Sequence, residues 1–119
     1  MSGSGAQAED IALEHLLGRG LQLITRNYRC RGGEIDLIMS DKQILVFIEV
    51  RHRTRTDFGT PEATVSHSKR RRLVLAARTY LYTHLMYAAR PMRFDVLAIQ
   101  GPLLERRIRW VQNAFASDE

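Results

Sequence analysis

The stretch that decides the fold runs from Glu34 to Arg51 and reads EIDLIMSDKQILVFIEVR. Two apolar runs, 34–39 and 44–51, flank the polar residues 40–43. A connection this short joins antiparallel strands, so we expect a hairpin. The second run is rich in β-branched residues and predicts a central strand that is buried on both faces.

Each apolar run of this hairpin carries a carboxylate, Asp36 in the first and Glu49 in the second. If the turn centres between Lys42 and Gln43, Asp36 lies directly opposite Glu49, with Cβ atoms roughly 5 Å apart. Two acids facing each other in an apolar sheet would repel and be poorly solvated without a cation between them. Carboxylate oxygens suit Mg²⁺ or Mn²⁺, which can activate a water and clamp a phosphoryl oxygen.

Ordinary ion pairs at the strand ends are the alternative explanation of the two acids, with Arg51, Arg53 or Arg31 as partners. Arg51 points to the same face as Glu49, because side chains alternate along a strand. Many metal-dependent nucleases have lysine at the place of Arg51. A guanidinium keeps its proton in proteins and cannot act as a base, but it can stabilise charge in a transition state.

Lys69 is the candidate for the missing amine. It lies four residues before Leu73, in the apolar stripe of a helix expected from about residue 62 or 66 to residue 86. We therefore expect Lys69 to point toward the sheet near the two acids, and Arg70 and Arg71 to face outward. A lysine whose stem covers the edge of the core is the alternative.

The basic composition favours a polyanionic partner. The net charge is +5, the sequence pI is about 10, and all cations except Lys42 and Lys69 are arginines. Arginine binds phosphate oxygens in a bidentate way, which suits nucleic acid; an arginine content that only reflects genome composition is the alternative. The residues expected to contact phosphates flank the two acids: Arg31, Arg53, Arg55, Arg70 and Arg71.

Length and composition narrow the class of protein to which the chain can belong. A chain of 119 residues predicts a single domain spanning residues 1–119, with residues 1–5 as a flexible lead-in. One cysteine excludes an internal disulfide and a cysteine-rich zinc cluster. The longest apolar runs, such as Ile44–Ile48, are too short for a membrane span, and no secretory signal is visible. We therefore expect a cytoplasmic location with no membrane contact.

The pattern along the whole chain predicts an α/β domain with a mixed sheet flanked by helices. The expected order is a helix, three strands, a helix, and one or two further strands. These elements cover residues 6–17, 21–28, 34–39, 44–51, 62 or 66 to 86, 93–99 and 108–111.

Several motifs carry a resemblance to a known family. They read AEDIALEHL, RNYRCRGGEIDLI, VFIEVRHR, FGTPEATVSHSKRRRL, RFDVLAI and NAF, and they cover nearly the whole chain. The chain resembles the YraN family of small bacterial proteins, which look like PD-(D/E)xK nucleases and archaeal Holliday junction resolvases. The resemblance implies a restriction-endonuclease-like core, metal binding by Asp36 and Glu49 together with Glu9, and Arg51 in the place of the motif lysine.

Three hypotheses follow. The first is an Mg²⁺- or Mn²⁺-dependent endonuclease acting on DNA, including branched or recombination intermediates, in which Asp36 and Glu49 hold the metal, Lys69 positions the water and Arg51 stabilises charge. The second is a nucleic-acid-binding module that keeps the fold without the chemistry. The third is a protein whose basic face binds an acidic protein partner. A resolvase of four-way junctions would require two active sites, which a homodimer would provide.

Overall fold

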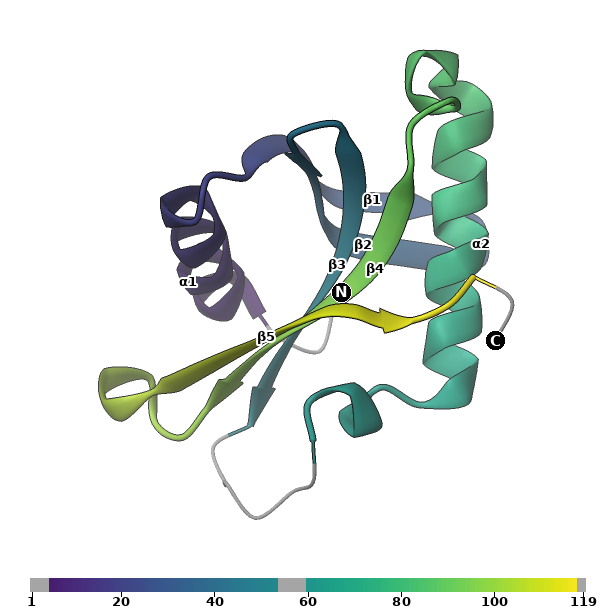
Figure 1. Ribbon diagram of the computed structural model, residues 1–119. Helices are drawn as coiled ribbons and strands as arrows, with labels where there is room; N and C mark the ends of the chain where they lie inside the picture. Colours follow the sequence, from purple (N-terminus) through teal and green to yellow (C-terminus); the bar gives the residue numbers. More distant parts are fainter. Residues whose placement is uncertain (1–4, 54–59, 118–119) are drawn as a thin grey trace.

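The computed structural model describes residues 5–53 and 60–117, and its strands form one mixed sheet between two helices (Figure 1). The strands lie in the sheet in their chain order, β1 to β5. Neighbours are antiparallel except β3 and β4, which are parallel and are joined through α2. The bounds are β1 Gln22–Cys30, β2 Gly33–Asp41, β3 Ile44–Arg53, β4 Met92–Gln100 and β5 Arg107–Phe115. The expected α/β class and element order are confirmed.

The helices are α1 (Gly5–Gly18) and α2 (His67–Thr83). Helix α2 begins later than residue 62 because the Ser66 hydroxyl caps it, accepting a hydrogen bond from the Lys69 backbone N–H at 3.2 Å. Short 3₁₀ turns occupy the flanking segments: η1 (Glu62–Thr64), η2 (Leu85–Tyr87) and η3 (Leu103–Glu105). Within the described ranges, no helix is long and apolar enough to cross a membrane.

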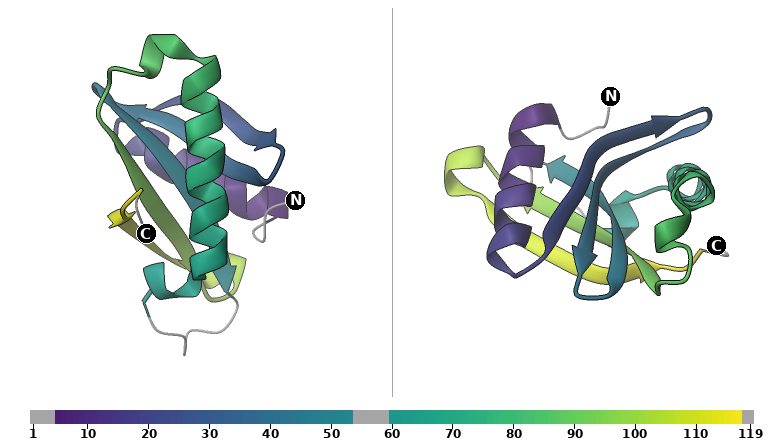
Figure 2. Two further views of the ribbon diagram at one scale, coloured as in Figure 1. Left: turned by 90° about the vertical axis from the view of Figure 1, so that its right-hand side faces the viewer. Right: turned by 90° about the horizontal axis from the view of Figure 1, so that it is seen from above.

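The two helices cover opposite faces of the sheet (Figure 2). Alternation along β3 divides its side chains between two cores. Leu45 and Phe47 pack with α2, whereas Val46 and Ile48 pack with α1. This alternation directs Glu49 to the α2 side of the sheet, the side from which Lys69 approaches.

The five strands of the sheet are each longer than the sequence predicts, α1 begins one residue earlier, and α2 ends at Thr83 rather than at residue 86. Strand β3 continues to Arg53, and β5 covers nine residues rather than the four of 108–111. Helix α1 begins at Gly5, the last residue of the expected lead-in, and residues 1–4 lie outside the described part of the chain.

Candidate metal centre

The β2–β3 hairpin brings Asp36 and Glu49 together. Its register runs from Asp41↔Ile44 at the turn to Leu37↔Ile48, and the next pair in the same register is Asp36 and Glu49. Both acids are 1% exposed. Lys42 supplies the turn with a positive φ of 57°, and the turn centres between residues 42 and 43, as the sequence predicts.

The Asp36 carboxylate is held by the backbone of the neighbouring strand. The backbone N–H of Val50 donates a hydrogen bond to Asp36 Oδ2 at 2.8 Å, in a buried position. The contact lies next to Leu37↔Ile48, the last backbone pair of the β2–β3 ladder. It therefore fixes the orientation of the carboxylate where the ladder ends.

The Glu49 carboxyl is strongly perturbed. Burial raises its pKa to about 8, and the charge of Asp36 and a hydrogen bond between the two side chains add to the shift. The nearby cations Lys69 and Arg51 act in the opposite direction. Glu49 therefore carries a proton at neutral pH when no metal is bound. Its Oε2 atom is buried and has no hydrogen-bond partner among the described residues.

Two cations approach the same oxygen of Glu49. Lys69 Nζ and Arg51 Nη1 each lie 3.7 Å from Glu49 Oε2. Lys69 also lies 3.9 Å from Glu34 Oε1. The side chains of Lys69 and Arg51 are 17% and 16% exposed, so solvent reaches this end of the site only in part. The helical spacing correctly predicts that Lys69 points toward the acids; its catalytic role stays a prediction.

Glu9 lies on α1 and is 4% exposed. Its Oε1 atom lies 3.9 Å from Arg26 Nη2, and Arg26 also pairs with Asp10 at 2.8 Å. Among the described residues, no group of three or more His, Cys, Asp or Glu side chains is gathered closely enough to hold a metal ion. The structure thus brings together Asp36 and Glu49 without Glu9, whose part as a third ligand stays a prediction.

The paired acids nevertheless have the donor chemistry of a magnesium or manganese site. Mg²⁺ keeps several waters and commonly takes only one or two carboxylates from the protein, with substrate phosphate oxygens as further ligands. The buried, unbonded Glu49 Oε2 is an oxygen that such a cation would satisfy. The residues present therefore fit the cation that the sequence predicts.

The arginines expected to contact phosphates occupy different settings. Arg31 is exposed at the β1–β2 turn, Arg53 is half-buried at the end of β3, and Arg71 is exposed on α2. Arg55 lies outside the described residues. Their role in binding nucleic acid stays a prediction.

Arg70 departs from the expected outward orientation. Its guanidinium donates hydrogen bonds to the backbone oxygens of Val65 at 3.0 Å and Glu62 at 2.7 Å. It also lies 5.2 Å from the ring centre of Phe115. Arg70 therefore ties η1 and β5 to the start of α2, because the η1 carbonyls lie within its reach.

Comparison with known proteins gives the family of the chain. The model of the uncharacterised protein family UPF0102 matches residues 8–99. The chain belongs to the UPF0102 family. A UPF0102 protein of Cupriavidus taiwanensis is 50% identical over 115 residues, which cover 96% of this chain and 83% of that protein. A relative in Pseudomonas entomophila is 46% identical over 113 residues, which cover 94% of this chain and 92% of that protein. These matches confirm the resemblance to the YraN family.

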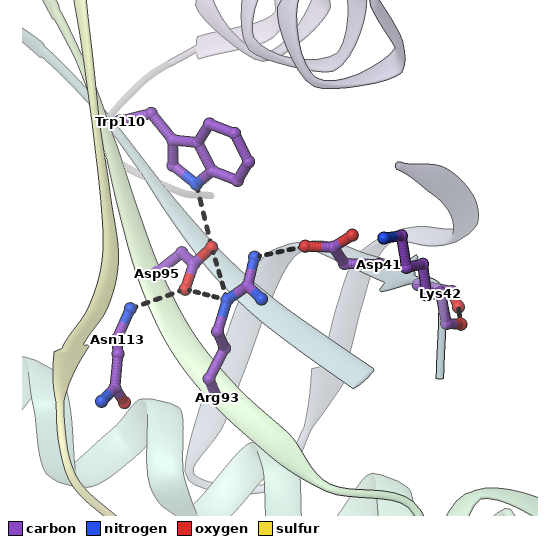
Figure 3. A network of polar contacts seen from close by, with 7 residues as sticks. Asp41, Lys42, Arg93, Asp95, Trp110 and Asn113 are labelled. Carbon is purple, nitrogen blue, oxygen red and sulfur yellow. Dashed lines mark hydrogen bonds and ion pairs between the residues drawn. The ribbon is translucent and has the colours of Figure 1, made fainter. Parts of the chain in front are cut away.

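The UPF0102 match also covers a buried charged residue that sequence reasoning missed, Asp95 on β4. Its carboxylate accepts hydrogen bonds from Arg93 Nε at 3.0 Å, Trp110 Nε1 at 2.9 Å and the Asn113 backbone N–H at 3.0 Å (Figure 3). Arg93 also reaches Asp41 at 3.1 Å. The network spans the β4–β5 irregularity and gives Asp95 a structural role.

Glu34 is the other residue that the sequence did not single out. It lies 3.5 Å from Arg29 and 3.9 Å from Lys69, measured between charged atoms. The available signal was its place two residues before Asp36 in GEIDLI. Glu34 links Lys69 to the β1–β2 turn and so helps to position the amine.

Proposed function

We propose that this UPF0102 chain is a metal-dependent endonuclease that hydrolyses phosphodiester bonds of DNA, with Mg²⁺ or Mn²⁺ as its cofactor. The observation that carries the proposal is the buried pair of Asp36 and Glu49, with Lys69 Nζ 3.7 Å from Glu49 Oε2. Burying two acids side by side costs folding free energy, and strongly perturbed groups of this kind cluster at functional sites.

Each side chain of the site has a distinct part in the proposed reaction. Asp36 and Glu49 would hold the cation through their carboxylate oxygens, with Glu49 in its deprotonated form. A cation held there would lower the pKa of a bound water and offset the charge of the phosphoryl oxygen. Lys69 positions the attacking water with its amine. Arg51 stabilises the charge that develops on the phosphate and does not act as a base.

The proposal extends to the substrate and its setting. The net charge of +5 and the position of Arg51 beside Glu49 favour a phosphate polymer. We take DNA as that polymer, and branched recombination intermediates as forms to test early, because the resemblance includes junction resolvases. A homodimer with two active sites and a cytoplasmic location belong to the same proposal.

A binding module without catalysis is the second candidate. The observation that favours it is Arg51, which replaces the motif lysine and lies 3.7 Å from Glu49 as a permanent counter-ion. Such a module would bind DNA through its arginines, would lose affinity with rising salt and would need no metal.

The experiment that separates the candidates is a cleavage assay with and without Mg²⁺ or Mn²⁺. Single-stranded, duplex, flap and four-way-junction DNA form the panel. Glu49→Gln and Asp36→Asn keep the side-chain shapes and remove the metal-binding charge. Glu14→Gln, at an exposed position of α1, makes the same chemical change away from the site.

The nuclease predicts metal-dependent cutting that Glu49→Gln and Asp36→Asn abolish and Glu14→Gln retains. DNA binding by the two site variants should stay intact or become tighter, because removing negative charge reduces repulsion of phosphate. Tight binding with no cutting under any metal condition would refute the nuclease and support the binding module.

A further inference from the structure

A cavity of about 300 Å³ lies beside the carboxylate pair. We call it the hairpin cavity; Arg29, Gly33, Glu34, Lys69 and Arg72 are among the residues that line it. Lys69 also lies beside Glu49, so the hairpin cavity adjoins the proposed metal site. Gly33 brings the β1–β2 turn against α2, since an added Cβ would lie 2.3 Å from the backbone oxygen of Arg72.

A second hollow, of about 640 Å³, lies along α2 and extends to Ser117, just after β5. We call it the helix groove, and its lining includes Ser68, Arg71, Arg72, Leu75, Arg78 and Ser117. The α2 positions recur at spacings of three and four, which places them along one side of the helix. Its described lining residues include three arginines and no acid.

Arg72 lines both hollows and joins them into one basic path. The path begins at Lys69, passes Arg72 and continues along α2 to Arg78. Figure 2 (left) shows helix α2 over its whole length. From Lys69 to Arg78 the helix rises about 14 Å. That rise matches the axial length of about four nucleotides of one duplex strand.

We propose that this path holds the phosphate backbone of the DNA strand on one side of the cleaved bond. The inference rests on the proposed function, because it takes its polymer from there and adds the direction in which the strand leaves the site. Arg71 and Arg78 lie two helical turns apart, about 10 Å along the axis, which corresponds to about three phosphate steps of a nucleic-acid strand, and serine hydroxyls are common phosphate donors. An acidic protein segment is the competing occupant.

The four consecutive cations of the run KRRR, residues 69–72, make different contacts. Lys69 faces the acids, Arg70 bonds to backbone carbonyls of η1, and Arg71 and Arg72 line the helix groove. The sequence shows four consecutive cations, whereas the structure assigns them to three different settings.

The test is DNA binding by the Arg72→Gln/Arg78→Gln double variant in EDTA, so that cleavage does not interfere. Fluorescein-labelled single-stranded and duplex DNA are titrated between 50 and 200 mM salt. The control is Arg19→Gln/Arg107→Gln, which removes the same charge from two exposed positions outside both hollows. Circular dichroism melts check that both double variants fold.

We expect the Arg72/Arg78 variant to lower the slope of log affinity against log salt by about two, because two phosphate contacts are lost. Its affinity near 100 mM salt should fall about 10- to 100-fold, and the control should lose much less. Equal losses in both variants would overturn the path. So would equal competition by polyglutamate at matched charge, which would indicate an acidic protein segment.

The outcome is separable from that of the nuclease assay. Cleavage that depends on Glu49 together with an unchanged salt slope would retain the nuclease and reject the path. A slope reduced by about two, without any cleavage, would retain the path as a binding surface and reject the nuclease.

Discussion

Replacing Glu49 by Gln should stabilise the metal-free protein increasingly as the pH rises. Glu49 has a pKa of about 8 in the folded protein and 4.5 as its ordinary value. An acid with a raised folded-state pKa binds its proton more tightly when folded, so its stabilising contribution is complete below pH 4.5 and is lost as the pH rises through about 8. Gln resembles the protonated acid and does not titrate.

The size of the effect follows from the pKa difference. Each pKa unit corresponds to about 1.36 kcal/mol, so a shift of about 3.5 units, from 4.5 to about 8, gives an upper limit of roughly 5 kcal/mol. Integrating the titration from pH 5 to pH 9, the wild-type protein should lose roughly 4 kcal/mol relative to Glu49→Gln. A loss of this size is a large share of the stability of an ordinary domain.

The assay is urea denaturation of both proteins at pH 5, 7 and 9 in EDTA, repeated with Mg²⁺. Glu14→Gln serves as the exposed control and should follow the wild type within about 0.5 kcal/mol. Mg²⁺ should raise the free energy of unfolding of the wild-type protein at pH 9 and leave that of Glu49→Gln unchanged, because a ligand stabilises only the state that binds it. Parallel stability curves for wild type and Glu49→Gln would refute the buried-carboxylate reasoning.

Three further substitutions test other parts of the structure. Lys69→Gln should lower the cleavage rate about 10²- to 10⁴-fold in single-turnover assays, and DNA affinity by about tenfold or less, because Lys69 is one of several cations on the basic path; a loss of binding as large as the loss of rate would assign Lys69 to binding instead. Asp95→Ala should cost about 3–5 kcal/mol of unfolding free energy, since it leaves the Arg93 charge buried without its main partner; a loss below about 1 kcal/mol in urea melts would contradict this. Gly33→Ala should cost about 1–3 kcal/mol because the Arg72 backbone oxygen cannot move aside freely, whereas Gly18→Ala, with open space around it, should cost less in the same melts.

The sequence predicts the hairpin pairing well because its determinants are local. A short polar turn and two apolar runs set the register, and the register alone places Asp36 beside Glu49. The direction of Lys69 follows equally from its spacing to Leu73 on one helix. These features depend on the periodicity of single elements, which a sequence displays directly.

Features that depend on contacts between distant elements could not be predicted. Arg70 turns back because a 3₁₀ turn presents the carbonyls of Glu62 and Val65, and the sequence pattern did not separate that turn from the helix. Asp95 lies at the centre of a hydrogen-bond network because β4 and β5 pair with a register shift, which places the Asn113 N–H at the Asp95 carboxylate. Neither arrangement leaves a periodic signal.

Manganese binding tests the central claim most directly, since it asks whether Asp36 and Glu49 form a metal site at all. Mn²⁺ would be titrated calorimetrically at pH 7 in two buffers of different ionisation enthalpy. We predict one site per chain, binding with release of about one proton from Glu49, and loss of that site in both Glu49→Gln and Asp36→Asn. Binding of equal strength in wild type and both variants, or no binding by the wild type, would contradict the account.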